Sequence, residues 1–203
     1  MLEYALLTFG SIFAIVDPFA AVPTFLAMTA RDTFEQRRRM ARTACTVCWL
    51  VMSLFAALGP AIFRLFGITL PAFQIAGGLV LLLSALDMVR ARKSPLKETP
   101  EETEEGMSKE DIAITPLAIP MLAGPGAITT SIVLAGRAGS WEHQVIFYTL
   151  IGAVSYLTYL ILTMAARGAR SFPHTILNII TRLMGLLLAA IGVQFIMTAL
   201  KIK

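Results

Sequence analysis

The sequence contains few charged residues, two cysteines and two histidines, and these scarcities exclude several classes of protein. Only 15% of its 203 residues are charged, whereas 57% are hydrophobic, and the mean hydropathy is +0.74. A soluble domain usually has about a quarter of its residues charged. The long stretches that are nearly free of charge therefore indicate a polytopic membrane protein instead of a single soluble core.

The scarce cysteines and histidines are not arranged as a metal site. Cys45 and Cys48 form one CxxC pair, and the histidines stand apart at His143 and His174. A zinc site would need a second such pair or nearby histidines, so we predict no metal site and interpret the cysteines as packing residues. No HExxH, GxSxG or phosphate-loop pattern occurs, so the sequence predicts neither an enzyme, a primary pump nor a cofactor.

Six segments have the length of about 20 residues and the apolar character that a membrane span needs. They are predicted at 2–30, 44–66, 70–89, 112–136, 145–166 and 176–200. The segment 97–111 is acidic and is predicted to be a flexible cytoplasmic linker between two three-helix units, 1–96 and 112–203.

Most of the 17 lysines and arginines fall between spans one and two, three and four, or five and six. Because basic loops stay in the cytoplasm, both termini are predicted to face outward. The same crowding at membrane edges explains the net charge of +4 without nucleic acid as a partner. Glu3 stands where a signal peptide would carry basic residues, so we expect no cleavable leader.

The two three-helix units align without a gap at an offset of 107 residues. The offset superposes Thr8 on Thr115, Ile12 on Ile119, Pro18 on Pro125, Ala20 on Ala127, Gly78 on Gly185, Leu79 on Leu186 and Leu81 on Leu188. Since each unit has an odd number of spans, the second enters the membrane from the opposite side. The fold class predicted is thus an all-α membrane protein of two inverted repeats, an architecture typical of secondary transporters.

Proline and glycine interrupt the first span and the fourth at equivalent positions, in "VDPFAAVPTF" and "AIPMLAGPGAITTS". Paired interruptions of this kind mark the solute site of many transporters, since freed backbone groups and helix ends can bind charged groups. Half-helix N-termini suit a carboxylate and half-helix C-termini suit an ammonium, so a small zwitterionic solute fits both. The predicted binding residues are Asp17, Pro18, Ala20, Pro23, Thr24, Gly124, Pro125, Gly126, Ala127, Thr129 and Thr130, with Ser131 as a further hydroxyl.

Asp17 has two compatible interpretations. An acid inside the membrane is costly and is by default a functional candidate, for contact with the solute or for carrying a proton. It also has the chemistry to cap the second half of an interrupted helix. Its equivalent in the second unit is Gly124, so the two interruptions are chemically different.

Four blocks in order, "DPFAAVPTFLAMT", "FQIAGGLVLLLSALDM", "PLAIPMLAGPGAIT" and "RLMGLLLAAIGVQFI", resemble the MarC family of bacterial integral membrane proteins. The resemblance implies six helices in the bacterial inner membrane and kinship with transporters of glycine and alanine. The family motif falls here on Asp17, Pro18, Pro23, Pro120, Gly124, Pro125, Gly126 and Ala127. Ala20 departs from the glycine of many members, and its methyl group is expected to narrow the site.

We therefore expect a secondary transporter of small neutral amino acids within the lipid bilayer. The alternatives are an exporter of other small solutes or amphipathic toxicants and a non-transporting membrane scaffold. A proton and sodium both remain open as the coupling ion, and the sequence predicts neither the direction of transport nor the oligomeric state.

Overall fold

The computed structural model describes residues 1–29, 32–90, 113–168 and 174–200, and within these segments every element is helical. The prediction of an all-α protein is confirmed for this part of the chain. The helices are α1 (Leu2–Val16), α2 (Pro18–Met28), α3 (Phe34–Phe66), α4 (Leu70–Val89), the π-helix η1 (Ala113–Leu122), α6 (Pro125–Gly136), α7 (Trp141–Arg167) and α8 (His174–Ala199). The predicted linker 97–111 lies outside the described residues.

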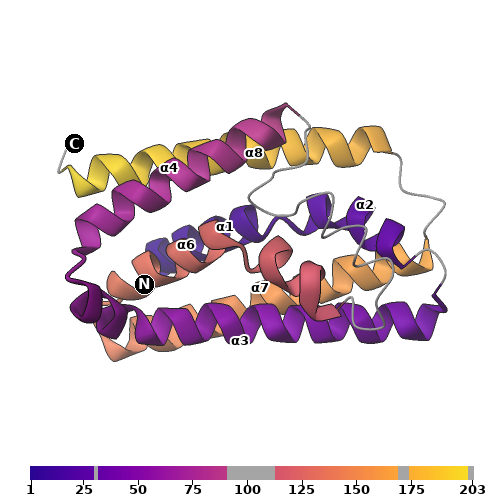
Figure 1. Cartoon of the computed structure of the whole chain (residues 1–203), viewed down its shortest axis with the longest axis horizontal. Coiled ribbons are helices and arrows are strands. Elements are labelled where there is room, and N and C mark those ends of the chain that lie inside the picture. Colours follow the sequence, from indigo (N-terminus) through magenta and orange to yellow (C-terminus); the bar gives the residue numbers. More distant parts are fainter. Residues whose placement is uncertain (30–31, 91–112, 169–173, 201–203) are drawn as a thin grey trace.

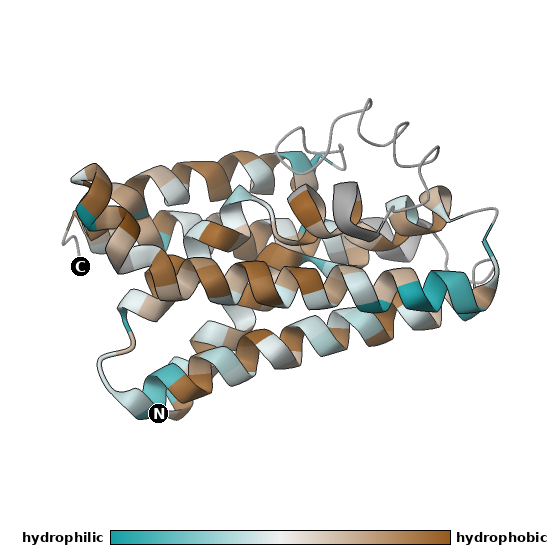
Figure 2. Ribbon diagram, turned by 60° about the horizontal axis from the view of Figure 1, so that its bottom comes forward, coloured by the Kyte–Doolittle hydropathy of each residue, from teal (hydrophilic) through white to brown (hydrophobic). Residues whose placement is uncertain are grey.

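The described helices have the length and composition of membrane spans. Five stretches qualify, with α1 and α2 counted together, and they are Leu2–Met28, Phe34–Gly59, Leu70–Val89, Trp141–Arg167 and Thr181–Ala199. The fourth predicted span, 112–136, is described from residue 113 onward as η1 and the shorter apolar helix α6. Figure 2 shows hydrophobic residues along the helices and hydrophilic ones at the end where α3 begins.

The second span begins earlier than predicted. We expected residues 31–43 to be a linker, but α3 starts at Phe34 because Thr33 and Gln36 form a capping box. The Gln36 amide N–H donates to Thr33 Oγ1 at 3.4 Å, and the Thr33 N–H donates to Gln36 Oε1 at 2.8 Å. These two hydrogen bonds satisfy two backbone N–H groups that otherwise have no partner at the start of a helix. α3 therefore begins before the arginines, and they lie in its first turns.

The helices form two outer pairs with the remaining elements between them. Figure 1 shows α4 beside α8 on one side and α3 with α7 on the other, and α1, α2, η1 and α6 lie between. α1 packs against α6, α7 and α8, while α6 packs against α3 and α4. The interrupted elements are therefore enclosed by the longer helices.

Glycines at positions 78 and 185 let α4 and α8 approach closely. A Cβ atom on Gly78 would lie 2.6 Å from the carbonyl oxygen of Gly192. One on Gly185 would lie 3.1 Å from the carbonyl oxygen of Ala85. Backbone oxygens cannot move aside as side chains can, so a methyl group at Gly78 would clash and one at Gly185 would be tightly packed.

Replacement of Gly78 by alanine should lower the free energy of unfolding by about 1–3 kcal/mol, the usual cost of overpacking. The matched control is Gly10→Ala, because a Cβ at Gly10 meets nothing within 4 Å. In that open position alanine should stabilise slightly, through its higher helix propensity. Thermal unfolding of both variants in detergent measures the difference, and equal melting temperatures would contradict the close α4–α8 contact.

Candidate functional site

α1 and α2 meet at Asp17, which ends one helix and begins the next. The Asp17 N–H donates to the Phe13 carbonyl oxygen at 3.0 Å, the last bond of α1. Its carboxylate Oδ1 then accepts from the Ala20 N–H at 3.3 Å, and Pro18 occupies the first turn of α2. The capping role proposed from the sequence is therefore confirmed, which leaves contact with a solute or a proton as a separate question.

Asp17 is fully buried and has an unusual backbone conformation. Its exposed fraction is 0%, and its φ of 46° is the only positive value at a non-glycine residue in the described segments. The left-handed region is costly for most side chains, and aspartate and asparagine tolerate it best. Such a conformation inside a bundle, maintained around a buried acid, is typical of functional sites.

η1 and α6 meet at a second junction, Ala123–Gly124. The Ala123 N–H donates to the Ala118 carbonyl oxygen at 2.8 Å, the wide spacing of a π-helix, which the sequence did not predict. Gly124 is extended, with φ −73° and ψ 175°, and α6 begins at Pro125 without a side-chain cap. Gly124 thus supplies no side-chain acceptor to the N–H groups in the first turn of α6, which carry a partial positive charge.

The ends of the two interrupted elements lie together inside the bundle. A Cβ atom on Gly126 would be 2.8 Å from Ile15 Cδ1 and 3.1 Å from Leu81 Cδ2. Ile15 precedes Asp17 by two residues, and Gly126 follows Gly124 by two. α2 also packs against η1, so each half of one interrupted element contacts the opposite half of the other.

The predicted binding residues differ in how they are placed. Gly124, Gly126, Ala127, Thr24 and Thr130 are buried, as is Pro18. Ala20 and Pro23 are partly exposed and Pro125 is exposed. Pro23 lies inside α2 and does not interrupt it, so the interruption is confined to Asp17 and Pro18.

The hydroxyl groups near the junctions have different partners. Thr130 is 0% exposed, and its Oγ1 has no hydrogen-bond partner among the described residues. Ser131 Oγ donates to the Ala127 carbonyl oxygen at 2.8 Å. The Thr129 side chain packs where a Cβ of Gly77 would be, so Thr129 contacts α4. Thr130 is thus the hydroxyl best suited to an additional partner, since a buried unmet donor is costly.

A cavity that the sequence analysis missed lies at the other end of α6. It has a volume of about 450 Å³ and lies among α3, α4, α6 and α7, with Ile132, Gly136, Gln144 and Tyr148 among its lining residues. Its side chains come from four helices, and those of α3 and α4 are far in sequence from those of α6 and α7. No local pattern could have revealed it.

Arg137 follows directly on α6 and contacts aromatic residues. Its guanidinium carbon lies 5.4 Å from the centre of the Phe195 ring, and burial lowers its pKa from the ordinary value. Nearby, the Tyr4 hydroxyl donates to the Leu134 carbonyl oxygen at 3.1 Å, and the Tyr4 and His143 rings are 4.8 Å apart. These contacts connect the start of α1 to the end of α6 and the start of α7.

The described residues contain no group of three or more histidine, cysteine, aspartate or glutamate side chains that could bind a metal ion. Cys45 and Cys48 are free thiols, and both are buried, in agreement with the packing role predicted for them. Within the described residues, the junctions offer one carboxylate, hydroxyl groups and a helix start without a side-chain cap at Gly124.

Comparison with known proteins identifies relatives along nearly the whole chain. Residues 2–203 match the model of a family described as MarC family integral membrane protein. A UPF0056 membrane protein of Methanocaldococcus jannaschii is 38% identical over 200 residues, covering 98% of this chain and 97% of the relative. One of Aquifex aeolicus is 36% identical over 193 residues, covering 95% and 90% respectively. The UPF0056 membrane protein YhcE of Escherichia coli is 35% identical with the same coverage, and no solved structure gives a significant match.

Proposed function

The chain belongs to the MarC family of integral membrane proteins, and on this premise we propose that it is a secondary transporter of small neutral amino acids. The observation that carries the proposal is the contact between two interrupted helical elements inside the bundle, one with a buried acid and one with an uncapped helix start. The solutes that fit best are glycine and alanine.

The charges at the two junctions complement a zwitterion. The Asp17 carboxylate suits the ammonium group, and the N-terminus of α6 suits the carboxylate. The Thr130 hydroxyl supplies a further hydrogen bond. Gly126 and Ala127 have little or no side chain of their own. Ile15 and Leu81 lie close to Gly126, so the space there favours a solute with a very small side chain.

The architecture we propose is a pair of inverted repeats, 1–96 and 112–203, and the packing of the helices supports it. α3 packs against η1 and α6, while its counterpart α7 packs against α1 and α2. Likewise α4 packs against α6, and its counterpart α8 against α2. Exchange of the two halves therefore reproduces most of these helix contacts. The largest exception is the contact of α1 with α8, whose counterpart, η1 with α4, is not among the main contacts of the described residues.

The glycine contacts between α4 and α8 support the same symmetry at the level of single residues. Moving Gly78 and Ala85 by the offset of 107 gives Gly185 and Gly192. The contact of Gly78 with the Gly192 carbonyl and that of Gly185 with the Ala85 carbonyl are therefore exchanged by the offset. These contacts agree with the proposed repeat, but any antiparallel helix pair relates contacts one heptad apart in the same way, so the repeat rests mainly on the helix packing above.

We propose that transport proceeds by alternating access in this arrangement. The paired interruptions would alternately open to either side as the enclosed elements α1–α2 and η1–α6 move against the longer helices. Asp17 would bind the ammonium group and, in a proton-coupled cycle, take up a proton when the solute leaves. Sodium is the alternative coupling ion.

The orientation we propose places both termini on the outer side of the bacterial inner membrane. α1 begins and α8 ends at the same end of the bundle, opposite the start of α3 (Figure 1). That start carries Arg37, Arg38 and Arg39, which favour the cytoplasm. A Gly139→Cys variant should react with an impermeant maleimide from the outside, and labelling only from the inside would overturn the orientation.

The transport proposal is tested with purified protein in liposomes. Radiolabelled glycine and alanine should enter the liposomes above the level of empty ones, and leucine should compete poorly because of its size. A preference for bulky or amphipathic solutes would favour the alternative of an exporter with broader specificity.

A further inference from the structure

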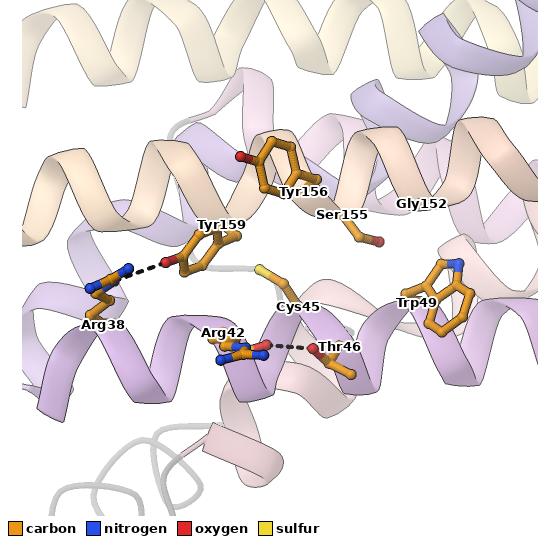
Figure 3. A pocket seen from close by; sticks show the side chains of 9 residues that line it. All are labelled: Arg38, Arg42, Cys45, Thr46, Trp49, Gly152, Ser155, Tyr156 and Tyr159. Atoms are coloured by element: carbon orange, nitrogen blue, oxygen red, sulfur yellow. Dashed lines mark hydrogen bonds between the residues drawn. The ribbon is translucent and has the colours of Figure 1, made fainter. Parts of the chain in front are cut away.

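A groove on the α3–α7 face combines cations at one end with aromatic and apolar surface at the other. It has a volume of about 420 Å³ and is separate from the junctions at Asp17 and Gly124. Figure 3 shows side chains of α3 and α7 facing one another across it, with Arg38 and Tyr159 at one end and Trp49 at the other. Its lining also includes Arg42, Cys45, Thr46, Gly152, Ser155 and Tyr156.

The charged end of the groove suits an anion. Arg38 Nε donates to the Tyr159 hydroxyl at 3.1 Å, which orients the guanidinium while using one of its five N–H donors. Arg42 follows one turn later on the same helix, and both arginines are exposed. The lining contains no acid, and the nearest acid on α3, Glu35, lies one turn before Arg38 and outside the groove. Two arginines with this spacing are well matched to a phosphate.

The opposite end of the groove suits a hydrocarbon chain. Trp49 lies eleven residues after Arg38, about 16 Å along the helix, within a stretch that is apolar enough to cross a membrane. The Trp49 side chain is 40% exposed and Tyr156 is 62% exposed. The lack of a side chain at Gly152 leaves space in the groove beside Trp49. A Cβ atom there would already be in contact with Trp49 Nε1, at 3.5 Å.

We propose that this groove binds an anionic phospholipid, with the phosphate at Arg38 and Arg42 and an acyl chain against Trp49 and Gly152. A free phosphate ion would use only the charged end. A second copy of the chain fits less well, since a symmetric contact on this face would set the arginines of two copies against each other. The lipid-site proposal does not rest on the transport proposal, because lipid binding can be measured on a protein that transports no solute.

Native mass spectrometry of the purified full chain tests the site with phosphatidylglycerol and phosphatidylcholine at equal concentration. Wild-type protein should retain phosphatidylglycerol preferentially. The double variant R38Q/R42Q should bind it roughly 30-fold more weakly, since each arginine near a charged lipid surface contributes a factor of about five. Arg39→Gln is the matched control, because Arg39 is exposed on the same helix but does not line the groove.

A second variant tests the apolar end without a change in charge. Gly152→Leu should fill the groove beside Trp49 and weaken phosphatidylglycerol binding, and millimolar inorganic phosphate should not displace the lipid from the wild type. Equal retention of the two lipids, equal effects of R38Q/R42Q and Arg39→Gln, or displacement by phosphate alone would overturn the proposal. A lipid-free dimer that Gly152→Leu dissociates would also overturn it, and would assign the face to a second copy.

Discussion

Replacement of Asp17 by asparagine should lower the flux of glycine roughly 30-fold or more, while the protein still folds. Loss of one member of a buried charge pair costs about 2–5 kcal/mol, and a neutral amide can neither pair with an ammonium group nor carry a proton. Flux into liposomes measures the effect, with the melting temperature in detergent as the check on folding.

Asparagine is the informative substitution because it preserves the structural role of Asp17. It tolerates the left-handed backbone at φ 46°, and its carbonyl oxygen can still accept from the Ala20 N–H. Asp17→Ala is the matched comparison, since it removes the cap as well and should cost about 1 kcal/mol or more of stability. If Asp17 served only as a cap, the asparagine variant would transport normally and only the alanine variant would be impaired.

Replacement of Gly126 by leucine should abolish transport. Even the first carbon of a side chain at Gly126 would lie 2.8 Å from Ile15 Cδ1 and 3.1 Å from Leu81 Cδ2, and leucine adds three more. The added volume fills the region between the two junctions and prevents the enclosed elements from approaching. Overpacking should also lower the free energy of unfolding by about 1–3 kcal/mol. Flux and thermal unfolding are measured on the same preparation.

Two further variants separate a blocked site from a general loss of packing. Gly126→Ala should give a smaller loss of flux, since its single methyl group requires only Ile15 and Leu81 to shift. Gly10→Leu carries the same side chain on α1 at a position with nothing within 4 Å, so it should transport normally. Full flux in a folded Gly126→Leu protein would support a site elsewhere or a scaffold that does not transport.

The positions of most helices could be predicted from the sequence because they depend on local composition. The end of α1 at Val16 and the start of α6 at Pro125 follow from prolines, which cannot continue a helix hydrogen-bond ladder. The close approach at Gly78 and Gly185 follows from the lack of a side chain. These features need no knowledge of distant residues.

Two kinds of feature were not predicted: a local capping signal that the surrounding charge obscured, and contacts between segments far apart in sequence. The arginines after Thr33 were assigned to a linker because charge dominates the composition there, but a capping box begins α3 before them. α3 also continues through Pro60 and ends at Phe66. The contact of Ile15 with Gly126 and the α3–α7 groove arise from packing between segments far apart in sequence.

The central claim is that the two junctions form a site for a small zwitterionic amino acid, and counterflow in liposomes tests it most directly. Liposomes loaded with unlabelled glycine should accumulate radiolabelled glycine or alanine transiently when they contain the wild-type protein. Empty liposomes and liposomes with folded Asp17→Asn protein should not. Counterflow that is absent with monodisperse wild-type protein, or unchanged in the Asp17→Asn variant, would contradict the account.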